Sequence, residues 1–231
     1  MLIADLHTHA ADDPLEKIGY SSEMLIMEAA RSGVQVLGIA AHEGLAYSSW
    51  LAEFAAKQDV LLMPATELTI ERKHVLILNP HPDHLLAKTF DDLRQLKGKG
   101  ELIVAPHPYY PTSNCLGNML LKHIDLFDAV ELCGFHVPLL RCNQRAQRVA
   151  RQNRLPLIAT TDTHMLPYRL NAYTLVESER TVESVLRAIR EGKATPVIAR
   201  RSAGSAYAAF CRVARSTFFA AVMEHTRGSH D

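Results

Sequence analysis

Residues 2–9 read Leu2-Ile3-Ala4-Asp5-Leu6-His7-Thr8-His9, and this stretch decides both the fold and the place of the chemistry. Its apolar part predicts a β-strand, and two histidines follow at the carboxyl end of that strand. Because residues two apart on a strand share a face, we expect His7 and His9 to point into one cavity. A strand that ends in metal-binding side chains is the unit that recurs along the chain.

Further short apolar runs predict further strands. They cover residues 35–40, 60–63, 74–78, 101–105, 129–132 and 155–160, with strand-like runs at 172–176 and 196–199. Their continuous apolarity favours strands that are buried on both faces. Helical patterns lie between most of them, at residues 22–31, 48–57, 141–152 and 182–191. This alternation predicts an α/β fold with a largely parallel sheet, either open or closed into a barrel.

The composition is typical of a globular protein with one sizeable core. The chain has 231 residues, of which 48% are apolar, and its formal net charge is zero. A balanced charge gives no whole-chain signal for a nucleic-acid or membrane partner. The four cysteines form no Cys-x-x-Cys pair, and the N-terminus lacks the pattern of a secretory signal. We therefore expect a reduced, cytoplasmic protein.

The chain divides into a body and a tail. No low-complexity linker or internal repeat interrupts residues 1–201, so we predict one domain there. Residues 202–231 are predicted to form a C-terminal helical tail, because apolar residues such as Phe210 and Phe218 recur at helical spacing. Arginines interrupt its apolar stretch, which argues against a membrane span. The tail is expected to pack on the barrel or on a second copy of the chain, in a homo-oligomer.

Candidate metal ligands stand at or beside the carboxyl ends of the apolar runs. They are His7, His9, His42, Glu67, His107, Glu131, Asp162 and His164. In parallel α/β folds these strand ends meet at one rim, where ligands bind. Imidazole and carboxylate donors without thiolate suit Zn²⁺, Mn²⁺ or Fe ions, and their number exceeds what one tetrahedral zinc uses. The sequence therefore predicts a multinuclear metal site able to activate a water for attack on phosphorus.

His74 differs from the other candidates because it precedes its apolar run. Six residues separate it from Glu67, which is too few for a crossover helix. We therefore predict that the strand at 74–78 runs antiparallel to the strand before it. The start of that strand would then lie at the same rim as the other ligands.

Four ordered motifs resemble those of the PHP (polymerase and histidinol phosphatase) superfamily. They are Asp5-Leu6-His7-Thr8-His9, Ala41-His42, Ala105-Pro106-His107-Pro108 and Thr161-Asp162-Thr163-His164, with Glu67 and His74 between the second and the third. The resemblance spans residues 2–200, and the ordered combination is far more specific than any single motif. It implies a distorted seven-stranded (βα) barrel of the PHP type, similar to a TIM barrel, and a metal-dependent phosphoesterase.

The resemblance also implies which residues would hold up to three divalent metal ions. One ion would be held by His7, His9, Glu67 and Asp162, and a second by Glu67, His74 and His107. A third would be held by His42 and His164 with an acidic residue of the loop after His9, either Asp12 or Asp13, of which Asp12 is favoured. Catalytic roles would fall to His42, Asp162 and His164.

Other residues near the motifs are candidates for supporting roles. Ala41 stands where the family often has an aspartate, and this departure bears on the orientation of His42. Glu131 is a candidate supporting acid or substrate contact. Tyr109 could stack on a base or wall the pocket, and Arg169 could bind a substrate phosphate. Arginines that share a face in the helix at 141–152 are interpreted as a solvated face rather than a nucleic-acid track.

The sequence thus favours hydrolysis of a phosphate ester by metal-activated hydroxide, with His164 assisting proton transfer. The expected substrate is a small phosphomonoester or a nucleotide, and the end of a nucleic-acid strand is an alternative. A metal-dependent amidohydrolase is the first rival, but such enzymes often use a bridging lysine at a strand end, whereas Lys73 precedes its strand. A non-catalytic metal-binding barrel is ranked last, because it has no need of so many convergent ligands.

Overall fold

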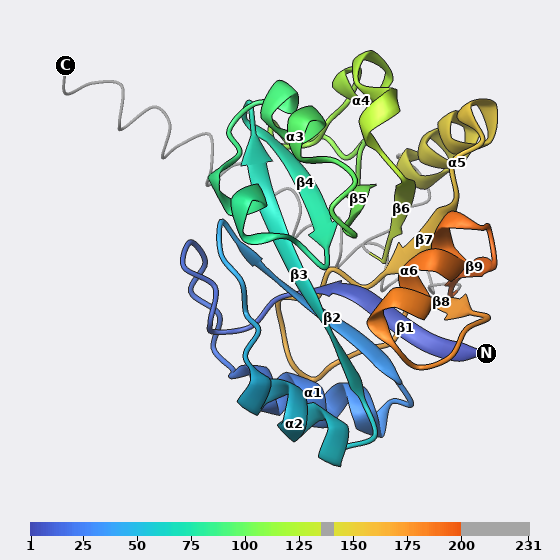
Figure 1. Cartoon of the computed structure of the whole chain (residues 1–231). Helices are drawn as coiled ribbons and strands as arrows, with labels where there is room; N and C mark the ends of the chain where they lie inside the picture. Colours follow the sequence, from blue (N-terminus) through green and yellow to red (C-terminus); the bar gives the residue numbers. More distant parts are fainter. Residues whose placement is uncertain (135–140, 200–231) are drawn as a thin grey trace, which may run out of the picture.

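Nine strands form one mixed sheet in the computed structural model, which describes residues 1–134 and 141–199. The strands are β1 (Leu2–Thr8), β2 (Val36–His42), β3 (Leu61–Ile70), β4 (Lys73–Leu78), β5 (Leu102–Ala105), β6 (Ala129–Cys133), β7 (Leu157–Thr160), β8 (Ala172–Val176) and β9 (Ala194–Ile198). Their order across the sheet is β7-β6-β5-β4-β3-β2-β1-β8-β9 (Figure 1). Every apolar run in the sequence that predicted a strand is confirmed.

Two parallel blocks are joined by one antiparallel strand. Strands β1, β2 and β3 are parallel to one another, and so are β5, β6 and β7. Strand β4 runs antiparallel to both of its neighbours, and His74 at its start pairs with Thr69 near the end of β3. The predicted antiparallel return of this strand is confirmed, and His74 lies at the same rim as Glu67.

The sheet curls into a nearly closed barrel at the rim that carries the ligands. The segment after β7 meets the end of β1 in parallel, since Asp162 N donates to His7 O at 2.9 Å and His9 N donates to Thr163 O at 3.1 Å. Strands β8 and β9 extend the sheet beyond β1 in antiparallel pairing. The described residues therefore form nine sheet strands, which differs from the seven of the expected barrel.

Helices cover the outside of the sheet. They are α1 (Ser22–Arg31), α2 (Ser49–Lys57), α3 (Phe90–Leu96), α4 (Met119–Lys122), α5 (Cys142–Asn153) and α6 (Val182–Arg190), with 3₁₀ turns at Pro82–Leu86 and Ile124–Leu126. Ser21, Ser48, Thr89 and Thr181 cap four of these helices by accepting a hydrogen bond from a backbone amide of the first turn. The four predicted helices are confirmed, whereas the short helices α3 and α4 lacked a clear periodic signal.

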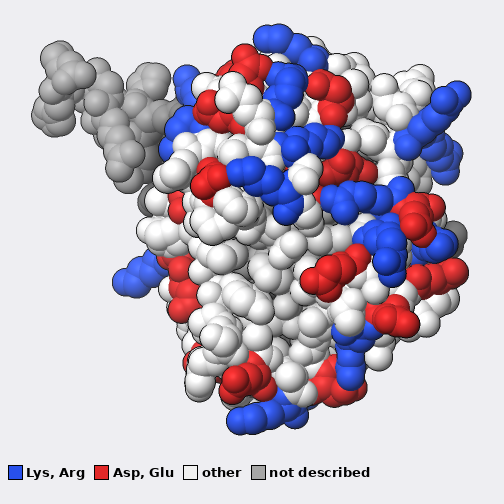
Figure 2. All heavy atoms as spheres, viewed as in Figure 1, with Lys and Arg blue, Asp and Glu red and all other residues white. Residues whose placement is uncertain are grey.

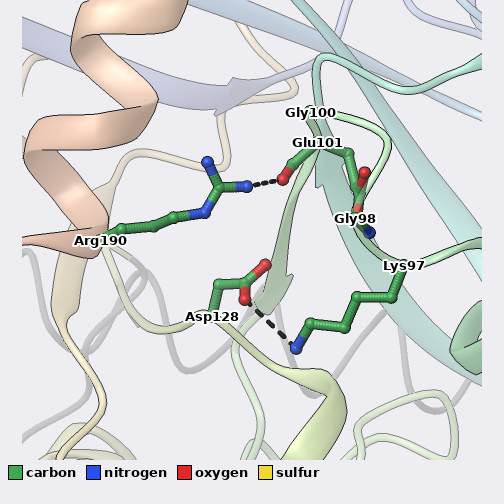
Figure 3. A pocket seen from close by; sticks show the side chains of 6 residues that line it. All are labelled: Lys97, Gly98, Gly100, Glu101, Asp128 and Arg190. Carbon is green, nitrogen blue, oxygen red and sulfur yellow. Dashed lines mark hydrogen bonds and ion pairs between the residues drawn. The ribbon is translucent and has the colours of Figure 1, made fainter.

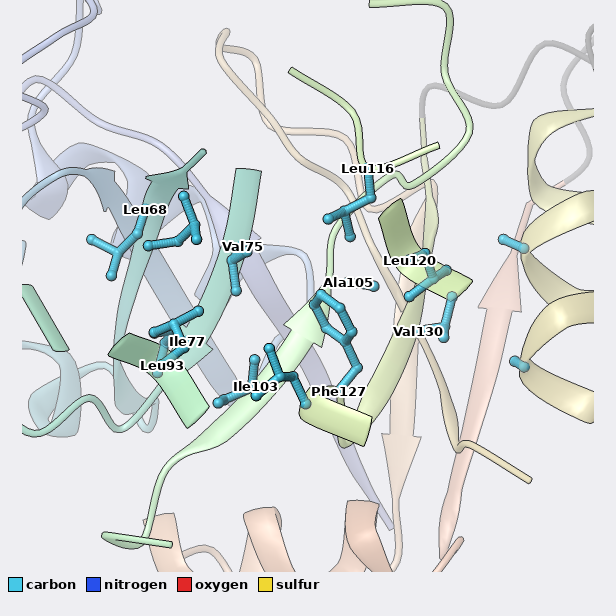
Figure 4. Close-up of a cluster of buried hydrophobic side chains, with 14 of the residues drawn as sticks. Leu68, Val75, Ile77, Leu93, Ile103, Ala105, Leu116, Leu120, Phe127 and Val130 are labelled. Carbon is cyan, nitrogen blue, oxygen red and sulfur yellow. The ribbon is translucent and has the colours of Figure 1, made fainter. Parts of the chain in front are cut away.

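Apolar side chains fill both the barrel and its outer layer. Alternate residues of the strands, such as Met63 and Ala65 of β3, belong to an inner cluster that includes Val185 and Ile189 of α6. An outer cluster packs β4, β5 and β6 against α3 and α4 around Phe90, which is fully buried (Figure 4). The predicted burial of the strands on both faces follows from these two clusters.

The surface agrees with the balanced composition. Acidic and basic side chains are interspersed on the face shown in Figure 2. No helix of residues 1–134 and 141–199 is long and apolar enough to cross a membrane. The predicted tail at 202–231 lies outside the described residues.

Strands β1 and β2 approach each other closely at Gly38. A Cβ atom added to this glycine would lie 2.5 Å from the carbonyl oxygen of Leu6. The hydroxyl of Thr8 donates to Gly38 O at 2.8 Å and ties the two strands together there. This contact holds the end of β1, which carries His7 and His9, against β2.

We predict that Gly38→Ala destabilises the protein by about 1–3 kcal/mol or more, because the clash is with backbone that cannot rotate away. Urea or thermal unfolding would measure the change. Gly19→Ala is the matched control, since nothing lies within 4 Å of a Cβ at that position. Equal unfolding midpoints for the two variants would contradict the prediction.

Candidate metal centre

The carboxylate of Glu67 lies at the centre of a cluster of histidines at the barrel rim. Glu67 belongs to β3 and is 1% exposed. Its Oε1 is 2.8 Å from His74 Nδ1 and 3.0 Å from His107 Nε2. Its Oε2 is 3.0 Å from His42 Nε2, 3.3 Å from His7 Nε2 and 3.6 Å from His9 Nε2. One buried carboxylate therefore faces five imidazoles.

These five imidazoles form a closed ring of neighbours. Ring centroids are separated by 5.0 Å from His7 to His9, 4.7 Å from His9 to His42, 5.2 Å from His42 to His74, 5.6 Å from His74 to His107 and 5.8 Å from His107 back to His7. His7 lies in β1, and His9 directly follows that strand. His42 ends β2, His74 lies at the start of β4, and His107 lies in the loop after β5. Sequence segments far apart in the chain thus meet at one site, as predicted from the strand ends.

Asp162 joins the ring from the segment after β7. Its Oδ1 is 3.4 Å from His9 Nε2 and 3.7 Å from His7 Nε2. These three residues could together hold one metal ion, with Glu67 Oε2 on the other side. The residues brought together here are those expected for the first ion.

The end of β1 is shaped by a β-bulge. The pairing of β1 with β2 shifts register between Asp5 and Thr8. Ala4 and Leu6 pack in the inner apolar cluster, yet His7 also points into the ligand ring. A bulge changes which face successive side chains take, and so it allows an apolar residue and the next histidine to face the same interior.

Two further combinations of ligand atoms share Glu67. His42, Glu67 and His74 lie within coordination reach of one another, and so do His7, Glu67 and His107. The residues expected for the second ion, Glu67, His74 and His107, are all present around Glu67 Oε1. The carboxylate can therefore bridge two ions, one at each oxygen.

The loop after β1 supplies Asp13, and this corrects the favoured choice of Asp12. Asp13 is buried, and its Oδ2 is 2.7 Å from His42 Nδ1 and 3.5 Å from His9 Nδ1. Asp12 is exposed and accepts a hydrogen bond from Ser22 of α1 instead. The two residues are adjacent in a short loop, so the sequence alone could not tell which side chain turns inward.

Asp13 also orients His42, which the alanine at position 41 cannot do. Its Oδ2 accepts a hydrogen bond from the backbone amide of His42 at 2.9 Å, and its Oδ1 accepts from Leu15 N and Glu16 N. The carboxylate therefore fixes both the backbone and the ring of His42. The aspartate missing at position 41 is replaced by one from another loop.

His164 lies at the outer edge of the cluster. Its ring stacks on His9 with a centroid separation of 4.2 Å, and its side chain is 29% exposed. Its Nε2 is 3.1 Å from Glu16 Oε2, and its Nδ1 is 3.0 Å from the carbonyl oxygen of Asp162. The expected grouping of His164 with His42 is not one of the ligand groups found among the described residues, where His9, Asp13 and His42 form the third.

Glu16 is a site residue that sequence reasoning missed. It lies in an irregular loop with no strand end to mark it, and only the acidic character of residues 12–16 gave any signal. The ion pair lowers the pKa of Glu16 and helps to raise that of His164 against the opposing effect of burial.

Glu131 supports the ligands from behind. It is fully buried, and its Oε1 accepts hydrogen bonds from His7 Nδ1 at 2.8 Å and Thr160 Oγ1 at 2.5 Å. Its Oε2 accepts from the backbone amide of His107 at 2.6 Å. The carboxylate leaves His7 Nε2 directed at Glu67, so its contacts are those of the supporting acid that was one of the two expectations for Glu131.

The two remaining substrate candidates lie near the rim. The Tyr109 ring packs under Arg145, whose Cζ is 4.1 Å from the ring centroid, and its buried hydroxyl has no hydrogen-bond partner among the described residues. Arg169 is exposed, and its side chain makes no hydrogen bond or ion pair in the part of the chain that the structure describes.

Burial and charge act against each other on the pKa values of the cluster. Burial alone would raise the pKa of Glu67, but the surrounding histidines hold it well below its usual value. Burial alone would lower the pKa of His7, but Glu131, Glu67 and Asp162 raise it well above its usual value. The pKa of His9 is lowered by burial and by neighbouring His164. Opposite charges thus stabilise each other in a site with little access to water.

The donor set fits divalent metal ions. His7 Nε2 and both ring nitrogens of His9 are buried and have no hydrogen-bond partner among the described residues. Buried polar atoms without partners are costly, and coordination to a metal would satisfy them. Imidazole and carboxylate ligands around a bridging glutamate suit Zn²⁺, Mn²⁺ or Fe ions.

A separate hollow of about 270 Å³ lies at the opposite ends of the strands (Figure 3). It is lined by Lys97, Gly98, Gly100, Glu101, Asp128 and Arg190. Lys97 pairs with Asp128 at 3.2 Å, and Arg190 donates to the carbonyl oxygen of Glu101. Its charges are thus already engaged in structural contacts, whereas the chemistry gathers at the other rim.

The comparisons with known proteins support the same interpretation. A family model described as PHP-associated matches residues 141–194. The fold is similar to that of a protein from Bifidobacterium adolescentis assigned as a metal-dependent phosphoesterase, with a TM-score of 0.58, 15% identity, and coverage of 70% of this chain and 87% of that one. It is also similar to the lesion-specific endonuclease PfuEndoQ from Pyrococcus furiosus, with a TM-score of 0.60 and 15% identity. The family model thus matches one segment of the chain, and the two solved structures share its fold.

Three further comparisons extend the likeness in fold. PsfC from Pseudomonas syringae has a TM-score of 0.63 and 15% identity, and the likeness covers 94% of this chain and 96% of that one. The likeness to PfuEndoQ covers 84% of this chain but 57% of the endonuclease. An amidohydrolase from Chromobacterium violaceum has a TM-score of 0.55 and 14% identity. No curated protein sequence matches the chain significantly.

We predict that Glu67→Gln abolishes most metal binding to this site, because it removes the carboxylate that faces all five imidazoles. For the natural protein, metal at 100 times its Kd should add about 2.7 kcal/mol to the free energy of unfolding, measured as a rise in Tm. Glu53→Gln is the control, since Glu53 is exposed on α2. The prediction fails if metal raises the Tm of Glu67→Gln as much as that of the control.

A second prediction concerns pH. Although burial opposes it, Glu67 and Asp13 raise the pKa of His42 to about 9 in the metal-free protein. His42 is therefore protonated at pH 7, and a metal that takes its Nε2 must displace a proton. Metal affinity should therefore rise with pH up to about 9. The number of protons released when metal binds should be about one lower for His42→Gln than for the natural protein.

Calorimetry of metal binding at pH 7, in two buffers of different ionisation enthalpy, would count these protons. His81→Gln is the control, because His81 is partly exposed and lies outside the ligand ring. Proton release that is the same in His42→Gln as in the control would contradict the assignment of His42.

Proposed function

We propose that this protein hydrolyses a phosphate ester at the cluster of five histidines around Glu67, using two or three divalent ions of zinc, manganese or iron. The observation that carries the proposal is the buried carboxylate of Glu67 inside a closed ring of five imidazoles. Such a set is far larger than one structural ion needs, and the bridging carboxylate suits ions a few ångströms apart. The PHP-associated family model that matches residues 141–194 and the likeness in fold to a metal-dependent phosphoesterase support this reaction class.

The proposed roles follow from the geometry. Divalent ions in such a site supply Lewis acidity for the phosphoryl oxygens and lower the pKa of a bound water. His7, His9, Glu67 and Asp162 would hold one ion, and Glu67, His74 and His107 a second. His42 would serve a third ion, together with His9 and Asp13, the carboxylate that is buried there.

His164 is proposed to donate a proton to the leaving group. Its raised pKa favours the protonated ring, because the ion pair with Glu16 outweighs the effect of burial. Its Nδ1 is anchored on the Asp162 carbonyl, so Nε2 is the atom that can exchange a proton at the rim. General acid catalysis needs a proton donor that reaches the reacting group and also meets solvent.

The proposed substrate classes are small phosphomonoesters, nucleotides and the ends of nucleic-acid strands. Arg141, Arg145 and Arg148 are exposed on α5, and no acidic residue occurs from 141 to 154. A substrate with several phosphates would gain from these charges. One neighbour in fold, endonuclease Q, is seen in complex with a duplex that carries an abasic lesion. Tyr109 and Arg169 are proposed to contact the substrate at the rim.

An amidohydrolase activity on a C–N bond is the second candidate, favoured by the fold similarity to the amidohydrolase from Chromobacterium violaceum. Lys73, the lysine nearest in sequence to a ligand, donates from Nζ to the carbonyl oxygen of Ser113. Glu67 fills the position between the ions that a modified lysine often takes in that class. We therefore rank amide hydrolysis below phosphate ester hydrolysis, and a non-catalytic barrel below both.

The proposal also covers the barrel type, the domain division and the oligomeric state of the chain. We propose that β1 to β7 form the seven-stranded PHP-type barrel and that residues 1–201 act as one domain with a helical tail at 202–231. The tail is proposed to support a homo-oligomer. A cytoplasmic location stays a prediction from the sequence.

The function is tested with purified full-length protein supplied with Mn²⁺ or Zn²⁺. The panel would contain p-nitrophenyl phosphate, nucleoside monophosphates, a 5′-phosphorylated oligonucleotide and amide substrates. We expect release of phosphate or nucleotide that EDTA abolishes and that His9→Ala lowers by about 1000-fold or more, since several kcal/mol of transition-state stabilisation are lost. His81→Ala is the control. Metal-loaded protein that cleaves no phosphoester, or cleaves only amides, would overturn the proposal.

A further inference from the structure

A buried thiol lies against one of the ligand imidazoles. Cys115 Sγ is 3.3 Å from His107 Nδ1 and 2.9 Å from Thr112 Oγ1. On the other side of the ring, His107 Nε2 is 3.0 Å from Glu67 Oε1. The two ring nitrogens therefore have separate neighbours, one being the thiol and the other the carboxylate at the centre of the ligand ring.

The loop that carries Cys115 is held in place by its own backbone. Cys115 N donates to Thr112 O at 3.3 Å, and Gly117 N donates to Pro108 O at 2.8 Å. Cys115 is 5% exposed and packs with Tyr110 and two other buried cysteines. The thiol is thus brought back to a residue eight positions earlier by a folded loop.

Neighbouring ligands have oxygen atoms where His107 has sulfur. His7 Nδ1 faces Glu131 Oε1, and His42 Nδ1 faces Asp13 Oδ2. Metal-binding imidazoles usually donate their second N–H to a carboxylate, a carbonyl or water, which fixes the tautomer and the ring orientation. Cys115 occupies that place for His107, with a sulfur atom instead of a carboxylate oxygen.

The same loop also reaches His74. Asn114 O accepts a hydrogen bond from His74 N at 2.8 Å, and Asn114 Nδ2 is 3.0 Å from His74 Nε2. The side of Glu67 that carries Oε1 therefore has both of its imidazoles contacted by adjacent residues of one loop.

We propose that Cys115 is the positioning residue of His107, an inference that rests on the proposed metal site. Its sulfur accepts a hydrogen bond from Nδ1–H, which leaves the lone pair on Nε2 directed toward Glu67. The loop from Thr112 to Cys115 thereby presets His107 for the ion at Glu67 Oε1.

The test compares metal binding by full-length variants without substrate. Cys115→Ser keeps an acceptor at this position, and Cys115→Ala removes it. Cys142→Ala is the matched control, because it removes a neighbouring buried thiol of the same cluster. Titration with Mn²⁺ and with Co²⁺, whose visible absorption reports its ligands, would follow each ion. Thermal unfolding in EDTA would check that each variant is folded.

We expect Cys115→Ala to weaken the binding of one ion by about 10- to 100-fold and to alter its Co²⁺ spectrum. Cys115→Ser should restore both, and Cys142→Ala should match the natural protein. If Cys115→Ala does not fold, Cys115→Val keeps the volume without an acceptor and serves the same comparison. Unchanged binding in Cys115→Ala, or equal losses in all three variants, would overturn the proposal. A protein that binds metal normally but cleaves no ester would refute the proposed function alone.

Discussion

The buried charge of Glu67 is the constraint on which the rest of the structure depends. An unpaired carboxylate in a protein interior costs several kcal/mol, so it persists there only with compensating partners. Five imidazoles on four different segments provide them, at distances of 2.8 to 3.6 Å. The barrel has to curl until the end of β1 meets the segment after β7, since that closure brings Asp162 to His7 and His9. The closure of the barrel and the assembly of the ligand cluster are therefore the same structural event.

Regular strands alone would not deliver these ligands. A bulge in β1 redirects His7, the reversal of β4 brings His74 to the rim, and a positive φ of 50° turns Asp162 inward. His107 also has a positive φ, of 27°. Backbone conformations of this kind cost about 1–3 kcal/mol each and persist where the surroundings over-determine them. The hydrogen bonds from His107 N to Glu131 and from Asp162 N to the His7 carbonyl supply that support.

Much of this arrangement could be predicted from the sequence because strand ends carry a local signal. An apolar run followed by His42 or Glu67 locates both the strand and the ligand, and a connection of two residues between β3 and β4 allows only a reversal. Side-chain direction in irregular loops carries no such signal. The sequence did not distinguish Asp13 from Asp12. The contacts of Glu16 with His164 and of Cys115 with His107 follow from the loop conformations in the structure. The number of sheet strands was likewise set by how β8 and β9 pair.

The density of the ligand ring limits how a substrate can be recognised. Neighbouring imidazole centroids lie 4.7 to 5.8 Å apart around the buried Glu67 carboxylate, so the ligand side chains themselves fill the centre of the site. Under the proposed function, the organic part of a substrate would rest on the exposed rim. There the Glu16 carboxylate would repel additional phosphates, whereas Arg145, stacked on Tyr109, would attract them. Under the proposed function, substrate specificity would therefore depend on loop residues that lie outside the motifs of the ligand cluster.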